Sequence, residues 1–417
     1  MTQQKGVGLA VSALGLFAIA VATLIPSPLS EPRVAETPFW CLVCGPLGLI
    51  DVILNVALFL PLGLGLRLLG WPFARIAIVS FLVSFAVESL QFVTILGRDA
   101  SVSDLITNTS GGLLGGFLAH HRYVLAFPTP RNAARLLAAG VLAVLGVFLS
   151  TVTLLQPDLP RGTWYGIVAP AWPGHGTFEG TVLDARIGVA PISRDTLPLA
   201  PKHRVALLSG DPILVRFGVG KTRPSGLAPL AVVASQEHRT LALLAQHGRD
   251  IVAGVRLRAS AWRLRSPRIR LNHVIPESAG DTVVAWGGFE GGELYAGGVA
   301  NQQRHSRRLS LSVGLGWALL LPIGGGIGPE AGPLNVLWLL ILIMPLAYWA
   351  GRSERGLALP SVGILVLIGL AFLPLAFGLR IGHWSEWIAG GAAIGLGVQM
   401  ARHLRPDTRR TRVDRRP

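Results

Sequence analysis

The chain has 417 residues, of which 51% are hydrophobic and only 14% are charged. An ordinary soluble globular protein carries roughly 25% charged residues, so this composition excludes that class. The net charge of +15 would suggest nucleic-acid binding in a soluble protein, but here the apolar composition must be explained first, and we expect no nucleic-acid partner. Two cysteines exclude a disulfide framework.

Apolar runs long enough to cross a bilayer form two groups. A hydrocarbon core about 30 Å thick requires roughly 20 helical residues. Five runs precede a long polar stretch and two or three follow it, near 7–25, 45–68, 73–96, 103–119, 135–155, 334–350, 359–379 and 386–402. A shorter run at 309–322 is interpreted as a re-entrant or interfacial segment, or as part of a helical hairpin. The sequence therefore predicts a polytopic α-helical membrane protein with about 8–9 transmembrane helices, the first of which is retained rather than cleaved as a signal peptide.

The short loops between the first five runs differ in positive charge. Loops on one side contain only Arg33 and Arg98, whereas the other side holds Lys5, Arg67, Arg75, Arg122, Arg131 and Arg135. The protein is expected in the cytoplasmic (inner) membrane. Because cytoplasmic loops are enriched in Lys and Arg, its N-terminus is expected in the cytoplasm. Five crossings then place residues 156–306 outside, and the basic tail 404–417 is expected inside.

Residues 156–306 have the character of an all-β domain inserted between the membrane segments 1–155 and 307–403. Strand candidates occur at 212–217, 230–234, 241–245, 251–257 and 282–286. Strict alternation of Arg with apolar residues at 255–258, 262–265 and 268–271 would place Arg on one strand face. Regular short strands with turn signals predict an extracytoplasmic β-sandwich or jelly roll.

The segments 246–252 and 280–291 resemble concanavalin-like (LamG-type) jelly rolls, and the resemblance implies binding of glycans or proteins on a concave sheet face. Trp residues and the Arg rows would supply stacking and hydrogen bonds to a sugar; the candidates are Trp164, Trp172, Trp262 and Trp286. Two alternatives stay open. In the first, the Trp side chains fill the core of the sandwich and the Arg side chains are solvated. In the second, the Arg rows contact anionic lipid headgroups.

Three consecutive spans carry a carboxylate and an amide on the same helix face. The pairs, three or four residues apart, are Asp51 with Asn55, Glu88 with Gln91, and Asp104 with Asn108. A carboxylate at the bilayer centre costs roughly 2.5–3.5 kcal/mol, so each requires a reason. At 1.5 Å per residue all three pairs fall in the outer leaflet, which predicts one polar cavity open to the outside with Arg98 beside it. The alternative is that these residues only join the helices by hydrogen bonds.

Small residues and one proline are expected to shape the second and fourth spans. Gly111 and Gly115, four residues apart, would allow the fourth helix to approach a neighbour closely. Pro61 removes one backbone hydrogen bond and is expected to kink the second span below Asn55.

The order of these residues resembles the VanZ-like family of bacterial membrane proteins over roughly residues 9–120. The matching motif consists of Asp51, Asn55, Phe59, Pro61, Leu62 and Gly63, then Glu88, Gln91, Arg98, Asp104, Asn108, Gly111 and Gly115. The resemblance implies a role in the cell envelope and, through the namesake of the family, in teicoplanin resistance; it implies no established activity. It also implies that Asp51, Glu88, Gln91, Arg98, Asp104 and Asn108 form a polar core.

The expected function is recognition of a polar or anionic envelope component, either lipid-linked or a glycan, with Arg98 binding the anionic group. Two alternatives remain. One is an intramembrane enzyme that uses Glu88 and Asp104 as general acid and base, and the other is a proton-coupled lipid transporter or flippase. We assign no catalytic residue and expect no metal or cofactor. The expected partners are the lipid bilayer and an envelope glycan or lipid-linked precursor; the oligomeric state and a disulfide between Cys41 and Cys44 stay open.

Overall fold

The computed structural model describes residues 2–24, 43, 47–94, 101–171, 176–192, 197–199, 201–321 and 325–404. The chain divides into two compact units. The helical unit comprises Met1–Leu145, Leu339–Val366 and Ala389–Pro417, and the sandwich unit comprises Gly146–Trp338 and Leu367–Ile388. Cys41, Cys44 and Arg98 lie outside the described residues.

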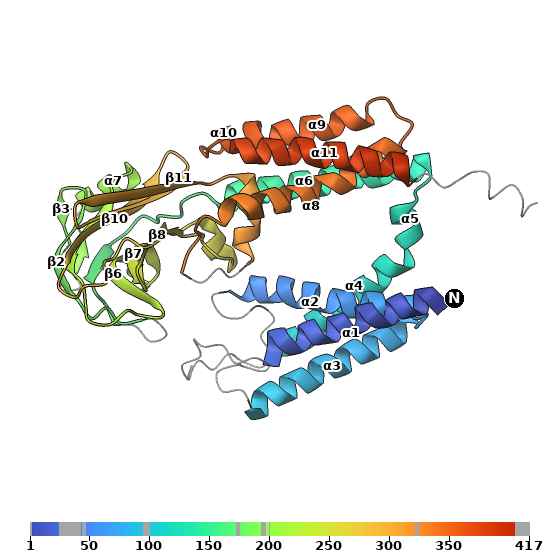
Figure 1. The fold of residues 1–417 in the computed structure, drawn as a ribbon, viewed down its shortest axis with the longest axis horizontal. Helices are drawn as coiled ribbons and strands as arrows, with labels where there is room; N and C mark the ends of the chain where they lie inside the picture. Colours follow the sequence, from blue (N-terminus) through green and yellow to red (C-terminus); the bar gives the residue numbers. More distant parts are fainter. Residues whose placement is uncertain are drawn as a thin grey trace, which may run out of the picture. The chain divides into compact units, whose positions relative to one another are not determined.

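Four long helices at the start of the helical unit lie side by side (Figure 1). They are α1 (Thr2–Leu24), α2 (Gly48–Leu68), α3 (Phe73–Thr94) and α4 (Val102–His120). The short α5 (Arg122–Ala126) leads into α6 (Pro130–Leu154), whose last residues belong to the sandwich unit. The later helices are α8 (Ala331–Arg352), α9 (Ala358–Leu367), a π-helical turn η3 (Ile368–Phe372), α10 (Leu373–Ala376) and α11 (Trp384–His403).

Six helical segments of the described chain are long and apolar enough to cross a membrane. They are Gln3–Leu24, Gly48–Leu68, Phe73–Gln91, Pro130–Leu154, Ala331–Arg352 and Ala358–Ala376. Helix α4 has similar length, but its first half contains Ser, Asp, Thr and Asn, and α11 begins with Trp-Ser-Glu and is rich in Gly. The apolar helices identify a multi-pass membrane protein, although their number is smaller than the eight or nine spans expected.

Helices α2 and α4 pack with their backbones in close contact because glycines line both sides. A Cβ atom added at Gly63 would lie 1.8 Å from the carbonyl oxygen of Gly112. At Gly111 and Gly115, a Cβ atom would lie 2.3 Å and 2.0 Å from carbonyl oxygens of α2. Helix α2 continues through Pro61 without interruption to Leu68.

The sandwich unit contains two antiparallel six-stranded sheets. One sheet has the order β4-β1-β6-β7-β8-β9 and the other has the order β12-β11-β10-β5-β2-β3. The first sheet is formed by β1 (Trp164–Val168), β4 (Leu197–Leu199), β6 (Leu227–Ser235), β7 (Thr240–His247), β8 (Asp250–Val255) and β9 (Ile269–Leu271). The second is formed by β2 (Thr181–Ile187), β3 (Ala190–Pro191), β5 (Ile213–Gly218), β10 (Thr282–Glu290), β11 (Glu293–Ala300) and β12 (Gln303–Ser310).

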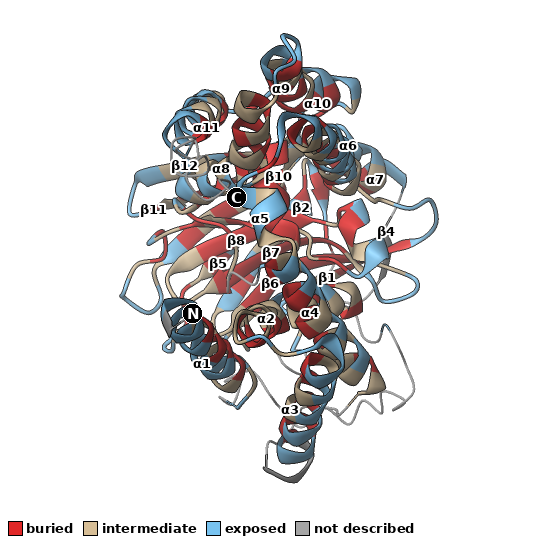
Figure 2. Cartoon of the chain, turned by 90° about the vertical axis from the view of Figure 1, so that its right-hand side faces the viewer, coloured by how far each residue is buried: buried red, intermediate tan, exposed pale blue. Residues whose placement is uncertain are grey.

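The two sheets pack face to face around an apolar core. A Cβ atom at Gly287 of β10 would meet the Cβ of Ala253 in β8 at 2.2 Å, so the sheets are in direct contact there. Strands β6, β7 and β8 are buried on both faces, as the red colouring of β7 and β8 in Figure 2 shows. Their sequences are nearly continuous apolar runs, which is typical of strands covered on both sides.

The strand predictions for this region are confirmed in part. The strands expected at 212–217, 230–234, 241–245, 251–257 and 282–286 fall in β5, β6, β7, β8 and β10, although β8 ends at Val255. The alternating segment 262–265 is not a strand, because the 3-10 helix η1 (Arg258–Trp262) ends there and Arg263 adopts a left-handed φ of 56°. Within the apolar run that begins at 309, the structure shows the end of β12 and a buried 3-10 helix, η2 (Val313–Leu319).

Candidate functional site

Helices α2, α3 and α4 bring several of the predicted polar residues into hydrogen-bonded contact. Asn55 on α2 donates from Nδ2 to Asp104 Oδ1 on α4 at 2.6 Å. Asn108, one turn further along α4, donates from Nδ2 to Ser84 Oγ on α3 at 2.9 Å. The Ser84 hydroxyl in turn donates to the backbone oxygen of Asp104 at 3.4 Å. We call Asn55, Ser84, Glu88, Asp104 and Asn108 the polar cluster.

Glu88 joins this cluster at the beginning of α4. Its side chain is buried, and Oε2 accepts a hydrogen bond from the backbone N–H of Ser101 at 3.2 Å. Ser101 is the N-cap of α4, and its Oγ accepts from the Ser103 N–H at 3.0 Å. The free N–H groups and dipole of a helix N-terminus favour a negative charge. The carboxylates of Glu88 and Asp104 therefore lie where the local backbone stabilises them.

Gln91 lies one turn after Glu88 on α3, and Asp51 lies one turn before Asn55 on α2. Gln91 is buried and donates from Nε2 to the backbone oxygen of Thr23 on α1 at 3.0 Å. Asp51 is exposed in the first turn of α2. Arg98, the cation predicted to accompany the carboxylates, lies outside the described residues.

Two serines of α3 belong to the same region but were missed in the sequence. Ser80 and Ser84 are fully buried, and a Cβ atom at Gly112 would lie 2.0 Å from Ser80 Oγ. Among the described residues, Ser80 Oγ and Asn108 Oδ1 are buried without a hydrogen-bond partner. The available signal was spacing, since Ser80, Ser84 and Glu88 follow one another at four-residue intervals on one helix face.

A different set of functional groups lies on the outward face of strands β10, β11 and β12. Trp286 lies across Gly297 of the neighbouring strand, because a Cβ atom there would be 2.2 Å from the indole ring. Tyr295 lies across Gly288 in the same way, at 2.6 Å from the phenol oxygen. The guanidinium of Arg304 is 5.2 Å from the Trp286 ring centroid. We call this surface the aromatic face.

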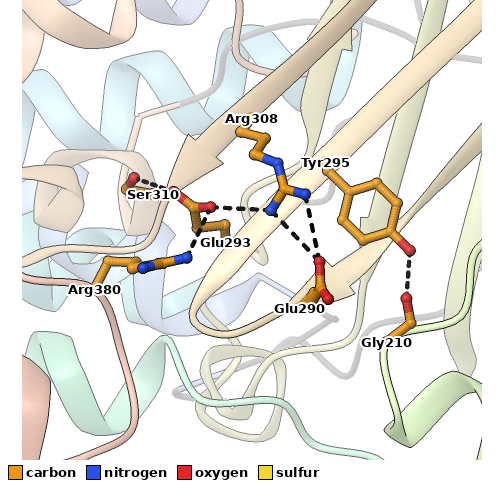
Figure 3. Close-up of polar contacts among 7 residues, drawn as sticks. All are labelled: Gly210, Glu290, Glu293, Tyr295, Arg308, Ser310 and Arg380. Carbon is orange, nitrogen blue, oxygen red and sulfur yellow. Dashed lines mark hydrogen bonds and ion pairs between the residues drawn. The ribbon is translucent and has the colours of Figure 1, made fainter.

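The aromatic face continues into the ion-pair network drawn in Figure 3. Arg308 contacts Glu290 at 3.4 Å and Glu293 at 3.2 Å, and Arg380 contacts Glu293 at 3.6 Å. Tyr295 donates its hydroxyl to the carbonyl oxygen of Gly210 at 2.5 Å. Desolvation, together with the negative charges of Glu290 and Asp211, raises the Tyr295 pKa to about 12. Tyr295 is thus a fixed neutral phenol at ordinary pH.

The remaining tryptophans and arginines proposed for a sugar site occupy dissimilar environments. Trp164 is 2% exposed and donates to the carbonyl oxygen of Pro160, so it belongs to the core. Trp262 is 65% exposed at the end of η1, and Trp172 lies outside the described residues. Arg256 pairs with Asp158 at 2.9 Å, and Arg270 pairs with Glu330 at 3.1 Å. The Arg rows therefore do not form one continuous solvated face.

Comparison with known families bears on the first part of the chain. Residues 14–125 match the family model described as VanZ/LLP1. The matched range is about a quarter of the 417 residues and contains every member of the polar cluster. No curated protein and no solved structure matches the chain significantly. Residues 14–125, which include the later part of α1 and all of α2, α3 and α4, are therefore similar to the VanZ/LLP1 family.

Proposed function

We propose that this protein resides in a bacterial cytoplasmic membrane and binds the polar headgroup of a lipid-linked or glycan component of the envelope at the polar cluster. The observation that carries the proposal is the meeting of Asn55, Glu88 and Asp104, from three different helices, around the N-terminus of α4. A set that only joined helices would need no carboxylates, because Ser, Thr or Asn serve at lower cost in a membrane.

The chemistry of the polar cluster suits a ligand rich in hydroxyl groups. Amides donate and accept, whereas carboxylates accept two or more hydrogen bonds each. Asn108 Oδ1 is an acceptor that the described residues leave unused. A sugar or phosphate-linked sugar offers the matching hydroxyl donors, and we propose that Arg98 binds the anionic group of such a headgroup, with Asp51 and Gln91 at the rim.

The proposed topology places both candidate surfaces on the outer side of the membrane. We propose that α4 and α11 also span the bilayer, which gives eight crossings and a cytoplasmic tail. Four helix ends belong to the sandwich unit: the ends of α6 and α10 and the beginnings of α8 and α11. This agrees with a topology in which all four lie on the same side of the membrane. The positive charge of the short loops assigns that side to the exterior.

We further propose that the sandwich is a concanavalin-like jelly roll whose aromatic face binds envelope glycan. Aromatic rings held flat and accessible stack on the apolar faces of sugar rings, while adjacent Arg side chains bind hydroxyl or acidic groups. Glycines beneath Trp286 and Tyr295 keep both rings flat against the sheet. This arrangement supports a binding surface rather than core packing.

The polar cluster is tested with the full-length protein purified in lipid nanodiscs. Glu88→Gln keeps an oxygen that accepts from Ser101 but removes the charge. We expect the envelope lipid or glycan that co-purifies with the wild type, measured by native mass spectrometry, to fall about tenfold, equivalent to about 1.4 kcal/mol. Ser89→Ala, at the exposed neighbouring position whose hydroxyl donates to the Phe85 carbonyl oxygen of its own helix, is the matched control. Equal ligand content in both variants would contradict the proposal.

The same preparation separates the alternative functions. An enzyme would convert a labelled lipid carrier into product, and a transporter would move it across liposomes in a pH-dependent manner without chemical change. Binding alone predicts neither result. Turnover or flipping that depends on Glu88 and Asp104 would replace the binding proposal with that activity.

The aromatic face is tested by retention on immobilised envelope polysaccharide. We expect Trp286→Ala to reduce retention of the full-length protein severalfold, because stacking area is lost. Trp262→Ala removes an equally large and more exposed indole, at the end of η1 rather than on the aromatic face, and this variant should be retained like the wild type. Retention that is unchanged by Trp286→Ala would exclude this face as the glycan site.

A further inference from the structure

A second buried carboxyl, unrelated to the polar cluster, lies in the sandwich unit. Glu386 is in the first turn of α11 and is only 1% exposed. Its Oε1 accepts two hydrogen bonds, from Ser312 Oγ at 2.6 Å and from Asn335 Nδ2 at 2.7 Å. Both donors are buried as well. A carboxyl removed this completely from water is rare, and burying its charged form is costly even when it is hydrogen-bonded.

The hydrogen bonds connect three segments that are distant in the sequence. Ser312 lies just after β12, Asn335 is in the second turn of α8, and Glu386 begins the last helix. Asn335 also accepts a bond at Oδ1 from Trp317 Nε1 of η2 at 2.8 Å. The end of the sandwich is therefore joined to the beginnings of α8 and α11 through one carboxyl.

The surrounding backbone is fitted closely to this carboxyl. A Cβ atom at Gly314 would lie 2.4 Å from Glu386 Oε1, and one at Gly382 would lie 3.0 Å from Oε2. Oε2 is buried and has no hydrogen-bond partner among the described residues. An unsatisfied buried oxygen costs roughly 1–3 kcal/mol. Both side-chain donors bind Oε1, so Oε2 is the oxygen on which a proton would be taken up.

The groups that face Glu386 are almost all uncharged. Ser312 and Gly314 come from the segment after β12, Asn335 comes from α8, and Gly382 comes from the segment between α9 and α11. The ionisable neighbour in the described chain is His383, three residues earlier. No described cation pairs with Glu386, so a proton is the counter-charge available to it.

We propose that Glu386 is a proton-binding site that couples the end of the sandwich to helices α8 and α11. A proton from the aqueous phase binds Oε2, the carboxylate becomes a neutral acid, and release reverses the step. The bonds from Ser312 and Asn335 are charge-assisted in the carboxylate form, and such bonds are roughly twice as strong as neutral ones. Protonation therefore loosens the connection between β12 and the two helices, and deprotonation tightens it.

Infrared difference spectroscopy of the full-length protein in nanodiscs tests this proposal directly. We expect a pH-dependent carboxylic-acid C=O band that titrates with one proton and is absent in Glu386→Gln. Glu330→Gln, which alters a partly exposed carboxylate paired with Arg270, should leave the band unchanged. A band that persists in Glu386→Gln, or the absence of any titrating acid band in the wild type, would overturn the proposal.

A second variant keeps the test valid if Glu386→Gln does not fold. Ser312→Ala removes one of the two donors to the carboxylate but retains Glu386. Because hydrogen bonds to the charged form favour that form, their loss should move the midpoint of the same infrared titration to higher pH. The folded state is checked by thermal unfolding. An unmoved midpoint in the folded variant would show that Ser312 and Glu386 are not coupled as proposed.

Discussion

The contact between Gly63 and Gly112 offers the sharpest test of the helical packing that builds the polar cluster. In Gly63→Ala, the new Cβ would begin 1.8 Å from the Gly112 carbonyl oxygen, whereas Cβ contacts under 3.0 Å are essentially never observed. Backbone atoms form this contact, so no side-chain rotation relieves it. Helices α2 and α4 must therefore separate locally by about 1.2 Å.

This separation has a calculable effect on the polar cluster. The bond from Asn55 to Asp104, which joins the same two helices, measures 2.6 Å. An added displacement of about 1.2 Å would lengthen it to about 3.8 Å, beyond the range of a hydrogen bond. Overpacking of this kind typically costs 1–3 kcal/mol. We expect a lower midpoint of thermal unfolding together with loss of the co-purifying ligand.

The matched control is Gly6→Ala on α1, where an added Cβ would meet no atom within 4 Å. It makes the same change in side chain and should leave both the unfolding midpoint and the ligand content unchanged. If Gly63→Ala behaved like Gly6→Ala in both measurements, the close approach of α2 and α4 would be refuted. Loss of ligand without loss of stability would instead show that the cluster is sensitive to smaller displacements.

Three further outcomes are expected from the sandwich. Folding raises the Tyr295 pKa from 10.0 to about 12, so the stability that this shift contributes is complete below pH 10 and is lost as the pH rises from 10 to about 12. Over this pH range, Tyr295→Phe should therefore lose less stability to unfolding than the wild type does. Asp158→Ala leaves the Arg256 guanidinium, 13% exposed, without its partner, so thermal unfolding should reveal a loss of roughly 1–3 kcal/mol, and an unchanged midpoint would argue against this pair. Gly297→Ala should push the Trp286 ring away from the sheet, shifting the tryptophan emission and lowering glycan retention, whereas a wild-type spectrum would count against the flat ring.

The helices and the pairing of polar residues on them could be predicted because both depend on local spacing. An apolar run of about 20 residues has one common solution in a bilayer. Likewise, Asp104 and Asn108 share a helix face whatever surrounds them. Spacing along one helix does not predict which residue of another helix will be the hydrogen-bond partner. Gln91 resembles Asn108 in the sequence, yet it bonds to a carbonyl of α1 rather than to the cluster.

Short-period patterns were less informative in the inserted domain. The alternation at 262–265 has the same form as a strand, but the left-handed Arg263 ends a 3-10 helix there. Trp164 and Trp286 are indistinguishable by composition, although one is in the core and the other is on the aromatic face. Ser312, Asn335 and Glu386 lie far apart in the sequence, so only the tertiary structure reveals that they meet.

The insertion of a twelve-stranded domain between α6 and α8 has a consequence for biosynthesis. In the proposed topology, residues 155–330, about 175 residues, must be exported after α6 is made and before α8 emerges, which takes about 9–35 s at 5–20 residues per second. Strand β12 is the last to appear and occupies a sheet edge. The early helices are therefore made well before the beginnings of α8 and α11, which belong to the sandwich unit and complete it.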